Sequence, residues 1–390
     1  MSKVLKASII LIFAFMMACT SNAYASFNAS PFEIDLQVRE GVSYNSNPAY
    51  DIRSREKSSW GSKLGETVTI QLPFGGTHRY TLLNNTDWTY YFNNNAFSHV
   101  NSNTVQSLDL IFSKWSFNLH QGFNISSTPT TEQLGIVESD LFKSVSPSAG
   151  IAATGDLGKL TLRTGFDYSY KSYNQDYDLL DQDSYIAFAD AGFEVMPVLD
   201  VFTRYTADMT KRRKDTMNDS FGNSIIGGVR GDITPYLVGE VGAGYSWYDF
   251  KKTDTAPDES DYSNMIYSGS LTNRLSRLTT QKVTFSLSPQ QGYTQGHDYY
   301  KSYVTKYTIT HELNDRINLN GIAAYINNAE GGAAETKEKS EIYQIGGGIK
   351  YFIAKYATLG ISYDFAYKDS NLHGKDYRQH EAVVQLIHNF

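Results

Sequence analysis

The sequence predicts an all-β fold: a transmembrane, antiparallel, up-and-down β-barrel of about 18 strands. Three observations predict it. Apolar and polar residues alternate with a period of two over ten or more residues, as in a strand that faces two different environments. Short and long connections alternate along the chain, as in barrels with short periplasmic turns and longer extracellular loops. The chain also ends on an aromatic residue, Phe390.

The first residues carry an export signal. Residues 1–25 combine a basic start, an apolar run and the small exit Ala23-Tyr24-Ala25, which is typical of a cleaved secretory signal peptide. Residues 26–390 then form a single outer-membrane barrel domain. In the alternative, the segment before Cys19 is a lipoprotein cleavage box and Cys19 is lipidated. Cys19 is the only cysteine, so residues 26–390 cannot form a disulfide.

The stretch WSFNLHQGFNIS, residues 115–126, shows the alternation that predicts a strand. Residues such as Phe117 and Leu119 lie on one parity, and residues such as Asn118 lie on the other. Gln121 is the exception, a polar residue on the apolar parity, and a bulge that shifts the parity there would explain it. The same split recurs at 34–44, 160–171, 237–247 and 358–368.

The connections determine the expected number of strands. Short turns are predicted at 75–76, 113–114, 154–158, 196–198, 232–235, 276–279, 314–315 and 353–355. Longer polar stretches lie at 47–61, 93–98, 127–139, 174–182, 210–220, 251–261, 289–297, 328–338 and 369–378. Eight turns and nine loops join 18 strands, with 16 as the alternative count. A secreted β-sandwich also alternates in polarity, but nothing in that fold requires connection lengths to alternate.

In a closed barrel of this size the polar face of each strand lines a lumen. Parity predicts lumen positions for Arg39, Arg79, Asp109, His120, Arg163, Asp167, Lys171, Arg204, Asp208, Arg230, Glu240, Arg274, Lys350 and Asp364. These residues are either a solvated wall of internal ion pairs or a selectivity lining, and their mixed signs favour neither simple anion nor simple cation selectivity. The 29 tyrosines fit interfacial girdles or a stacking path for sugar rings.

Several function classes find no support in the sequence. The chain has 34 Lys and Arg against 41 Asp and Glu, without a basic block, which argues against nucleic-acid binding. No two histidines share a strand face at a metal-binding spacing. His120, with Asp109 on the preceding strand, is the closest approach to a catalytic pair, but no nucleophile accompanies it. We therefore expect no enzyme activity, no catalytic or metal-binding residues and no cofactor.

Three stretches resemble the outer-membrane proteins called putative β-barrel porin type 2. They are LQVREGVSYNSNPAYD at 36–51, PSAGIAATGDLGKLTLRTGFDYSYKSY at 147–173, and the closing strand to Phe390. The similarity extends over nearly the whole mature chain as a pattern rather than as a sharp motif. Genes of this family often lie with exopolysaccharide biosynthesis genes. Because Phe390 lies on the lipid-facing parity, it resembles the signal read by the barrel assembly machinery.

The resemblance implies a channel in the outer membrane of a Gram-negative cell, surrounded by lipid, that passes a polysaccharide chain with periplasmic and inner-membrane partners. Two other hypotheses stay open. One is a general or sugar-selective uptake porin. The other is a structural or adhesive surface barrel whose long loops bind a partner. The sequence does not distinguish the direction of transport.

Overall fold

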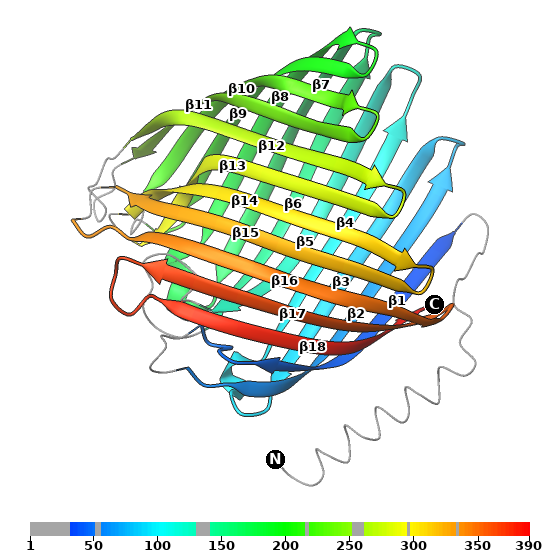
Figure 1. Cartoon of the computed structure of the whole chain (residues 1–390). Coiled ribbons are helices and arrows are strands. Elements are labelled where there is room, and N and C mark those ends of the chain that lie inside the picture. The colour runs from blue at the N-terminus through cyan, green and yellow to red at the C-terminus, as the bar shows by residue number, and fades with distance from the viewer. Residues whose placement is uncertain are drawn as a thin grey trace.

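The computed structural model is a closed barrel whose wall is one antiparallel sheet (Figure 1). It describes residues 32–50, 56–129, 141–214, 218–251, 261–294, 297–332 and 335–390. The predicted signal peptide and Cys19 lie outside these residues. None of the described helices is both long and apolar enough to cross a membrane.

The described residues form 18 strands of 13 to 18 residues each. The strands are β1 (Glu33–Asn45), β2 (Ser59–Phe74), β3 (His78–Tyr91), β4 (His99–Ile111), β5 (Trp115–Pro129), β6 (Leu141–Asp156), β7 (Leu160–Tyr173), β8 (Gln182–Met196), β9 (Leu199–Arg212), β10 (Asp219–Thr234), β11 (Leu237–Lys251), β12 (Tyr262–Ser276), β13 (Thr279–Thr294), β14 (His297–Asn314), β15 (Ile317–Gly331), β16 (Lys339–Ala354), β17 (Ala357–Ser370) and β18 (Tyr377–Asn389). Two short 3-10 helices, η1 (Asn95–Phe97) and η3 (Gln175–Leu180), lie in the connections after β3 and β7.

Every strand pairs with its neighbours in sequence, and the first strand closes the barrel against the last. Val42 of β1 lies opposite Ser62 of β2 and Val384 of β18. Beyond the end of β18, the Phe390 amide donates to the Leu36 carbonyl at 2.8 Å. The predicted count of 18 is confirmed, and the alternative of 16 is wrong. The eight predicted short turns all join consecutive strands.

The length of the strands matches a membrane. The shortest strands have 13 residues, and 13 residues at about 3.3 Å each, tilted by about 40°, span roughly 33 Å along the barrel axis. This exceeds the apolar band of about 25 Å that outer-membrane barrels present to lipid. The stretch from Trp115 continues to Pro129 in β5, three residues beyond the predicted end.

A contact across the barrel shows which parity faces inward. The Arg212 guanidinium of β9 donates to the Gly292 carbonyl of β13 at 3.2 Å. Three strands, β10 to β12, separate these residues along the wall, so the contact crosses the interior. The pairing register of each ladder then shows which parity of each remaining strand faces inward. The opposite face carries large exposed apolar side chains, such as Ile225 on β10 and Ile361 on β17.

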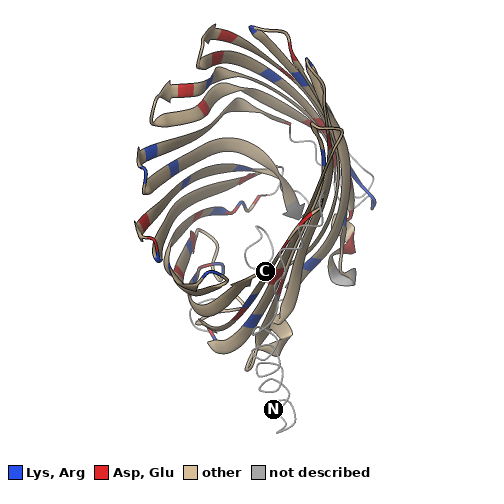
Figure 2. Ribbon diagram, turned by 90° about the vertical axis from the view of Figure 1, so that its right-hand side faces the viewer, with Lys and Arg blue, Asp and Glu red and all other residues tan. Residues whose placement is uncertain are grey.

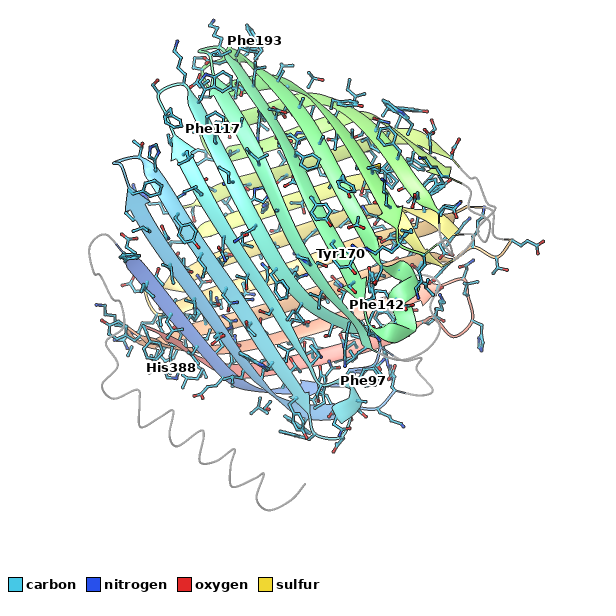
Figure 3. The ribbon with its side chains drawn as sticks, turned by 180° about the vertical axis from the view of Figure 1, so that it is seen from behind. Phe97, Phe117, Phe142, Tyr170, Phe193 and His388 are labelled. Atoms are coloured by element: carbon cyan, nitrogen blue, oxygen red, sulfur yellow. The ribbon has the colours of Figure 1, made fainter. Side chains whose placement is uncertain are left out.

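Aromatic side chains mark both ends of the outward face. Phe117 and Phe193 lie near the end of the barrel that carries the short turns, and Tyr170 lies toward the opposite end (Figure 3). Phe193 is 51% exposed. Such bands are typical of the two interfaces of a membrane, where a ring can contact both hydrocarbon and water.

One part of the wall folds inward at the end of the barrel with the long loops. The ladder between β12 and β13 ends at Tyr267 and Leu287, although β13 continues to Thr294. Beyond this point the Tyr299 ring packs on Phe250 at 5.8 Å and on Tyr262 at 5.0 Å between centroids. We call residues 288–294 and 297–301 the inward hairpin. The sequence predicts a long connection at 289–297, whereas in the structure β13 continues to Thr294 and β14 begins at His297.

The same end of the barrel contains a buried ion cluster. Glu338, just before β16, contacts the ammonium groups of Lys368 and Lys375 at 2.9 Å each. The side chains of Glu338 and Lys368 are fully buried. Burial raises the pKa of the Glu338 carboxyl, but the two ammonium groups outweigh it, and the pKa lies below its usual value. The cluster joins β16, β17 and the loop before β18.

We expect Glu338→Gln to destabilise this end of the barrel by about 3 kcal/mol at pH 7, because two buried ammonium groups lose their carboxylate. Hydrogen exchange of peptides covering the ends of β16 to β18 would measure the loss. A carboxyl whose pKa is lowered on folding stabilises the protein above its unfolded pKa, and this contribution disappears as the pH falls through the folded pKa. The difference from wild type should therefore disappear in acid. Glu335→Gln, at an exposed position, is the control. Equal protection in both variants would contradict the prediction.

Candidate functional site: the lumen and its mouth

All fourteen residues predicted to line the lumen lie on the parity that Arg212 assigns to the interior. The set is Arg39, Arg79, Asp109, His120, Arg163, Asp167, Lys171, Arg204, Asp208, Arg230, Glu240, Arg274, Lys350 and Asp364. Basic and acidic positions are interspersed along the ribbon, and neither sign forms a continuous belt (Figure 2). These residues differ in whether their charged groups form ion pairs with other residues of the wall.

On β1 to β3 the lumen wall is held by Arg39. Its guanidinium donates to Thr67 Oγ1 at 2.6 Å and to Asn85 Oδ1 at 2.7 Å, and lies 3.0 Å from the Asp87 carboxylate. Because these partners lie on β2 and β3, the side chain runs along the wall rather than into the channel. Arg39 thus contributes to the wall more than to any free positive potential.

The His120 region differs from the expected pair. Asp109 accepts from Asn118 Nδ2 at 2.7 Å and contacts Arg79 at 3.5 Å, so it does not bond His120. His120 Nε2 lies 2.7 Å from the Asp167 carboxylate instead. This contact passes over Gly150 of β6, where any Cβ would clash with both partners. The predicted Asp109–His120 association is therefore wrong. Instead, hydrogen bonds and ion pairs form a network along the wall that contains Arg79, Asp109, Asn118, His120 and Asp167.

A tighter ion cluster lies on β8 to β11. The Asp190 carboxylate, with a side chain only 1% exposed, accepts from Arg204 Nε at 3.0 Å and from Arg230 Nη1 at 2.9 Å. Arg204 also contacts Glu240 at 3.2 Å, and Arg230 lies 3.6 Å from Asp200. Both guanidinium groups also lie near the Phe202 ring, at 5.3 and 5.2 Å from its centroid. This cluster holds two cations against three anions.

Three of the predicted lumen cations remain unpaired. Arg163, Arg274 and Lys350 are exposed, and none forms an ion pair with another residue that the structure describes. The Arg163 guanidinium lies 5.3 Å from the centroid of Phe188, which holds its position over β8. Free cations of this kind face the channel water, so they contribute to its potential more than the paired arginines do.

The mouth of the lumen contains a cavity of about 360 Å³ beneath the inward hairpin. We call it the mouth cavity. Its lining includes Lys171, Tyr173, Asp208, Arg212, Tyr248, Phe250, Gln291, Tyr299 and Tyr300. The cavity brings together Lys171 and Asp208, two predicted lumen residues from different strands. It also contains aromatic residues that the prediction did not assign to a site.

The Tyr248 side chain defines one wall of the mouth cavity. Its hydroxyl donates to the Asp208 carboxylate at 2.6 Å, crossing β10 from β11 to β9. The ring passes directly over Gly222, where a Cβ would clash with it. On the opposite side, Gln291 Nε2 donates to Ser220 Oγ at 3.0 Å and thereby attaches the inward hairpin to β10.

Among the described residues no group of three His, Cys, Asp or Glu is arranged to hold a metal ion. The charged side chains mostly pair with one another, and the aromatic residues at the mouth surround a cavity that is open to the lumen. Such a lining can bind and pass a polar solute through hydrogen bonds and ring contacts.

A closed antiparallel barrel with an apolar outer face, aromatic bands and a polar, charge-paired interior is a porin-like channel of the outer membrane. The chain belongs to the family described as putative beta-barrel porin 2, whose model matches residues 30–390. The family predicted from the sequence is thus confirmed. No curated protein matched the chain.

Solved structures of similar fold match most of the chain. OccAB3 of Acinetobacter baumannii is 10% identical with a TM-score of 0.46, over 93% of this chain and 99% of that chain. The outer membrane protein OpdK of Pseudomonas aeruginosa is 12% identical with a TM-score of 0.48, over 92% and 99%. OpdO of the same organism is 10% identical with a TM-score of 0.49, over 93% and 97%. At these values the similarity concerns the fold alone.

Proposed function

We propose that this channel conducts saccharide chains, and that its cargo is an exopolysaccharide leaving the cell. The observation that carries the proposal is the mouth cavity, in which Tyr248, Tyr299 and Tyr300 lie beside amide and carboxylate groups. Sugars present apolar CH faces and hydroxyl groups together. A site that combines aromatic rings with hydrogen-bonding groups matches both features.

The wall of the lumen supports passage rather than retention. The Arg204 and Arg230 guanidinium groups are already bound by Asp190, so they are less available to hold a charged polymer. Many weak contacts let a chain advance, whereas a few strong ones would stop it. The push would come from polymer synthesis at the inner membrane through periplasmic partners, because no nucleotide is present at the outer membrane.

A second candidate is uptake of a small polar solute, and the inward hairpin favours it. The hairpin narrows the mouth, and a cavity of about 360 Å³ has the size of a site for one small molecule. The lining would be equally suited to a free sugar that enters the cell. Export and uptake therefore share the site and differ in direction and in the length of the cargo.

The site is tested by block of single-channel current in planar bilayers with oligosaccharides of several neutral and acidic classes. We expect at least one class to block reversibly, and Tyr300→Ala to weaken that block roughly tenfold through the loss of a ring contact. Tyr300→Phe should keep the block. Tyr236→Ala, at a 65% exposed position beside a short turn, is the control. A Tyr300→Ala channel that is blocked as strongly as wild type would contradict this assignment.

The direction is tested in cells by deleting the gene while leaving polymer synthesis intact. Export predicts that polymer disappears from the surface and accumulates in the periplasm. Uptake predicts normal surface polymer together with slower growth on a particular sugar. Unchanged surface polymer would rule out export even if oligosaccharides block the channel.

A further inference from the structure

The outer wall of β2 to β5 carries a cluster of polar side chains in the region where the outer walls of β16 and β17 carry isoleucines. We call this region the outer polar patch. It consists of Glu66, Asn84, Thr86, Ser102, Thr104, Gln106 and Gln121, all on the outward parity and near the middle of their strands. This wall lies on the side of the barrel that faces the viewer in Figure 3. At corresponding outward positions β16 and β17 carry Ile345, Ile349 and Ile361.

The patch does not arise from a slip of the strands. The ladder between β4 and β5 runs without interruption from Ser102 opposite Ile125 to Ile111 opposite Ser116. Gln106 lies directly opposite Gln121 in that ladder. The bulge expected at Gln121 is therefore absent, and this side chain points outward with its neighbours.

The members of the patch bond one another. Thr86 and Ser102 share a hydrogen bond of 2.9 Å, and Asn84 Nδ2 donates to Thr104 Oγ1 at 2.9 Å. Gln121 Nε2 donates to Gln106 Oε1 at 2.8 Å.

Two amide groups retain unused capacity after these bonds. Gln106 Oε1 also accepts from the Tyr80 hydroxyl at 3.1 Å. Within the described part of the chain, Gln106 Nε2 and Gln121 Oε1 have no partner. A hollow of about 350 Å³, lined in part by Tyr80, Gln106, Gln121 and Ala149, lies at this point of the wall.

Lipid hydrocarbon cannot supply hydrogen-bond partners for these amide groups. An amide donor or acceptor without a partner in an apolar medium costs about 1–3 kcal/mol by protein mutational data. The occupant must therefore present both donors and acceptors at the same depth in the membrane. Small side chains such as Ala149 and Thr104 allow another wall to approach closely.

We propose that the outer polar patch is the contact between two copies of this chain. The Gln106–Gln121 pair at its centre carries one unused donor group and one unused acceptor group on adjacent strands, and this makes the pair self-complementary. In a two-fold contact, Gln106 Nε2 of each copy donates to Gln121 Oε1 of the other, which satisfies both amides at once. Glu66 lies two strands from Gln106 and is level with Ser102, four residues away along β4, so its position is roughly 16 Å from Gln106, at the edge of the contact.

Cross-linking in native membranes tests the contact. A variant without Cys19 would carry either Thr104→Cys in the patch or Ile361→Cys, at a 49% exposed outward position on the other side of the barrel. A short bis-maleimide should convert the Thr104→Cys protein to a species of twice the mass and leave the Ile361→Cys protein monomeric. Equal yields from both positions, or an adduct of Thr104→Cys with a different outer-membrane protein, would overturn the proposal.

A second measurement removes the amides and keeps the fold. In the double variant Gln106→Leu, Gln121→Leu, apolar side chains replace the amides on a face that lipid also tolerates. We expect the dimer fraction measured by light scattering in detergent to fall at least tenfold at constant protein concentration, with unchanged heat-modifiable migration and single-channel conductance. A folded double variant that remains dimeric would overturn the proposal. This result would leave the proposed cargo unaffected.

Discussion

Replacement of residues 289–301 by Asn-Gly is expected to increase the single-channel conductance at least about twofold, because the current then no longer passes the narrowing at the mouth. Ser288 and Ser302 lie opposite each other in the β13–β14 ladder, so a two-residue turn can join the shortened strands there. The variant removes Gln291 and Gly292, through which the inward hairpin contacts Ser220 and Arg212.

A control for this variant shortens a different connection, the one between β3 and β4. Replacing residues 94–97, which include η1, by Asn-Gly removes a shorter segment at the same end of the barrel. Its conductance should equal that of wild type. If the shortened β13–β14 variant also conducts like wild type while it remains folded, the inward hairpin does not limit the current.

The second large effect is expected from Asp190→Asn, which leaves Arg204 and Arg230 without their shared carboxylate. The cluster then holds two cations and two anions. Arg204 keeps its contact with Glu240 and Arg230 its longer contact with Asp200, but both guanidinium groups become more available to channel ions. We expect a shift of the reversal potential in a salt gradient toward anions. Loss of one partner of a buried ion pair costs about 3–5 kcal/mol, and the partial exposure of the arginines places this variant at the lower end.

Asp200→Asn tests whether the shift in reversal potential comes from the change in net charge or from the loss of the carboxylate that pairs with the arginines. It removes the same formal charge from the same cluster, but Asp200 lies 3.6 Å from Arg230 and is one-third exposed, so no buried contact is lost. We expect a small change in reversal potential and an unchanged midpoint of urea unfolding in lipid vesicles. Equal shifts in the two variants would mean that net charge alone, and not the pairing of the arginines, sets selectivity.

The alternation of residues within strands was sufficient to predict the face of each side chain. In β5, for example, Phe117 and Leu119 alternate with Asn118 and His120, and the barrel keeps this parity along the unbroken β4–β5 ladder. The reason is physical: backbone groups in lipid must pair with one another, so the sheet closes and every strand keeps one face toward lipid. Even Gln121, the apparent exception, keeps its parity.

Parity does not determine which side chains meet within a face. His120 and Asp109 share the lumen face, but Asp109 lies opposite Asn118 in the ladder, and the missing side chain at Gly150 lets His120 reach Asp167 on β7. Pairing of this kind depends on the stagger of neighbouring strands and on the space that each leaves, neither of which a single strand encodes.

The sequence by itself determined that this chain is an 18-stranded barrel with a polar lumen, because strand period and turn lengths are local properties. The tertiary structure alone decided three other features: the fold of the inward hairpin into the mouth, the burial of Glu338 between two lysines, and the clustering of outward polar residues on β2 to β5. Each arises from contacts between strands that are distant in sequence or from the register of adjacent strands. Closure of the barrel brings these residues together, and the residue pattern within a single strand does not predict these contacts.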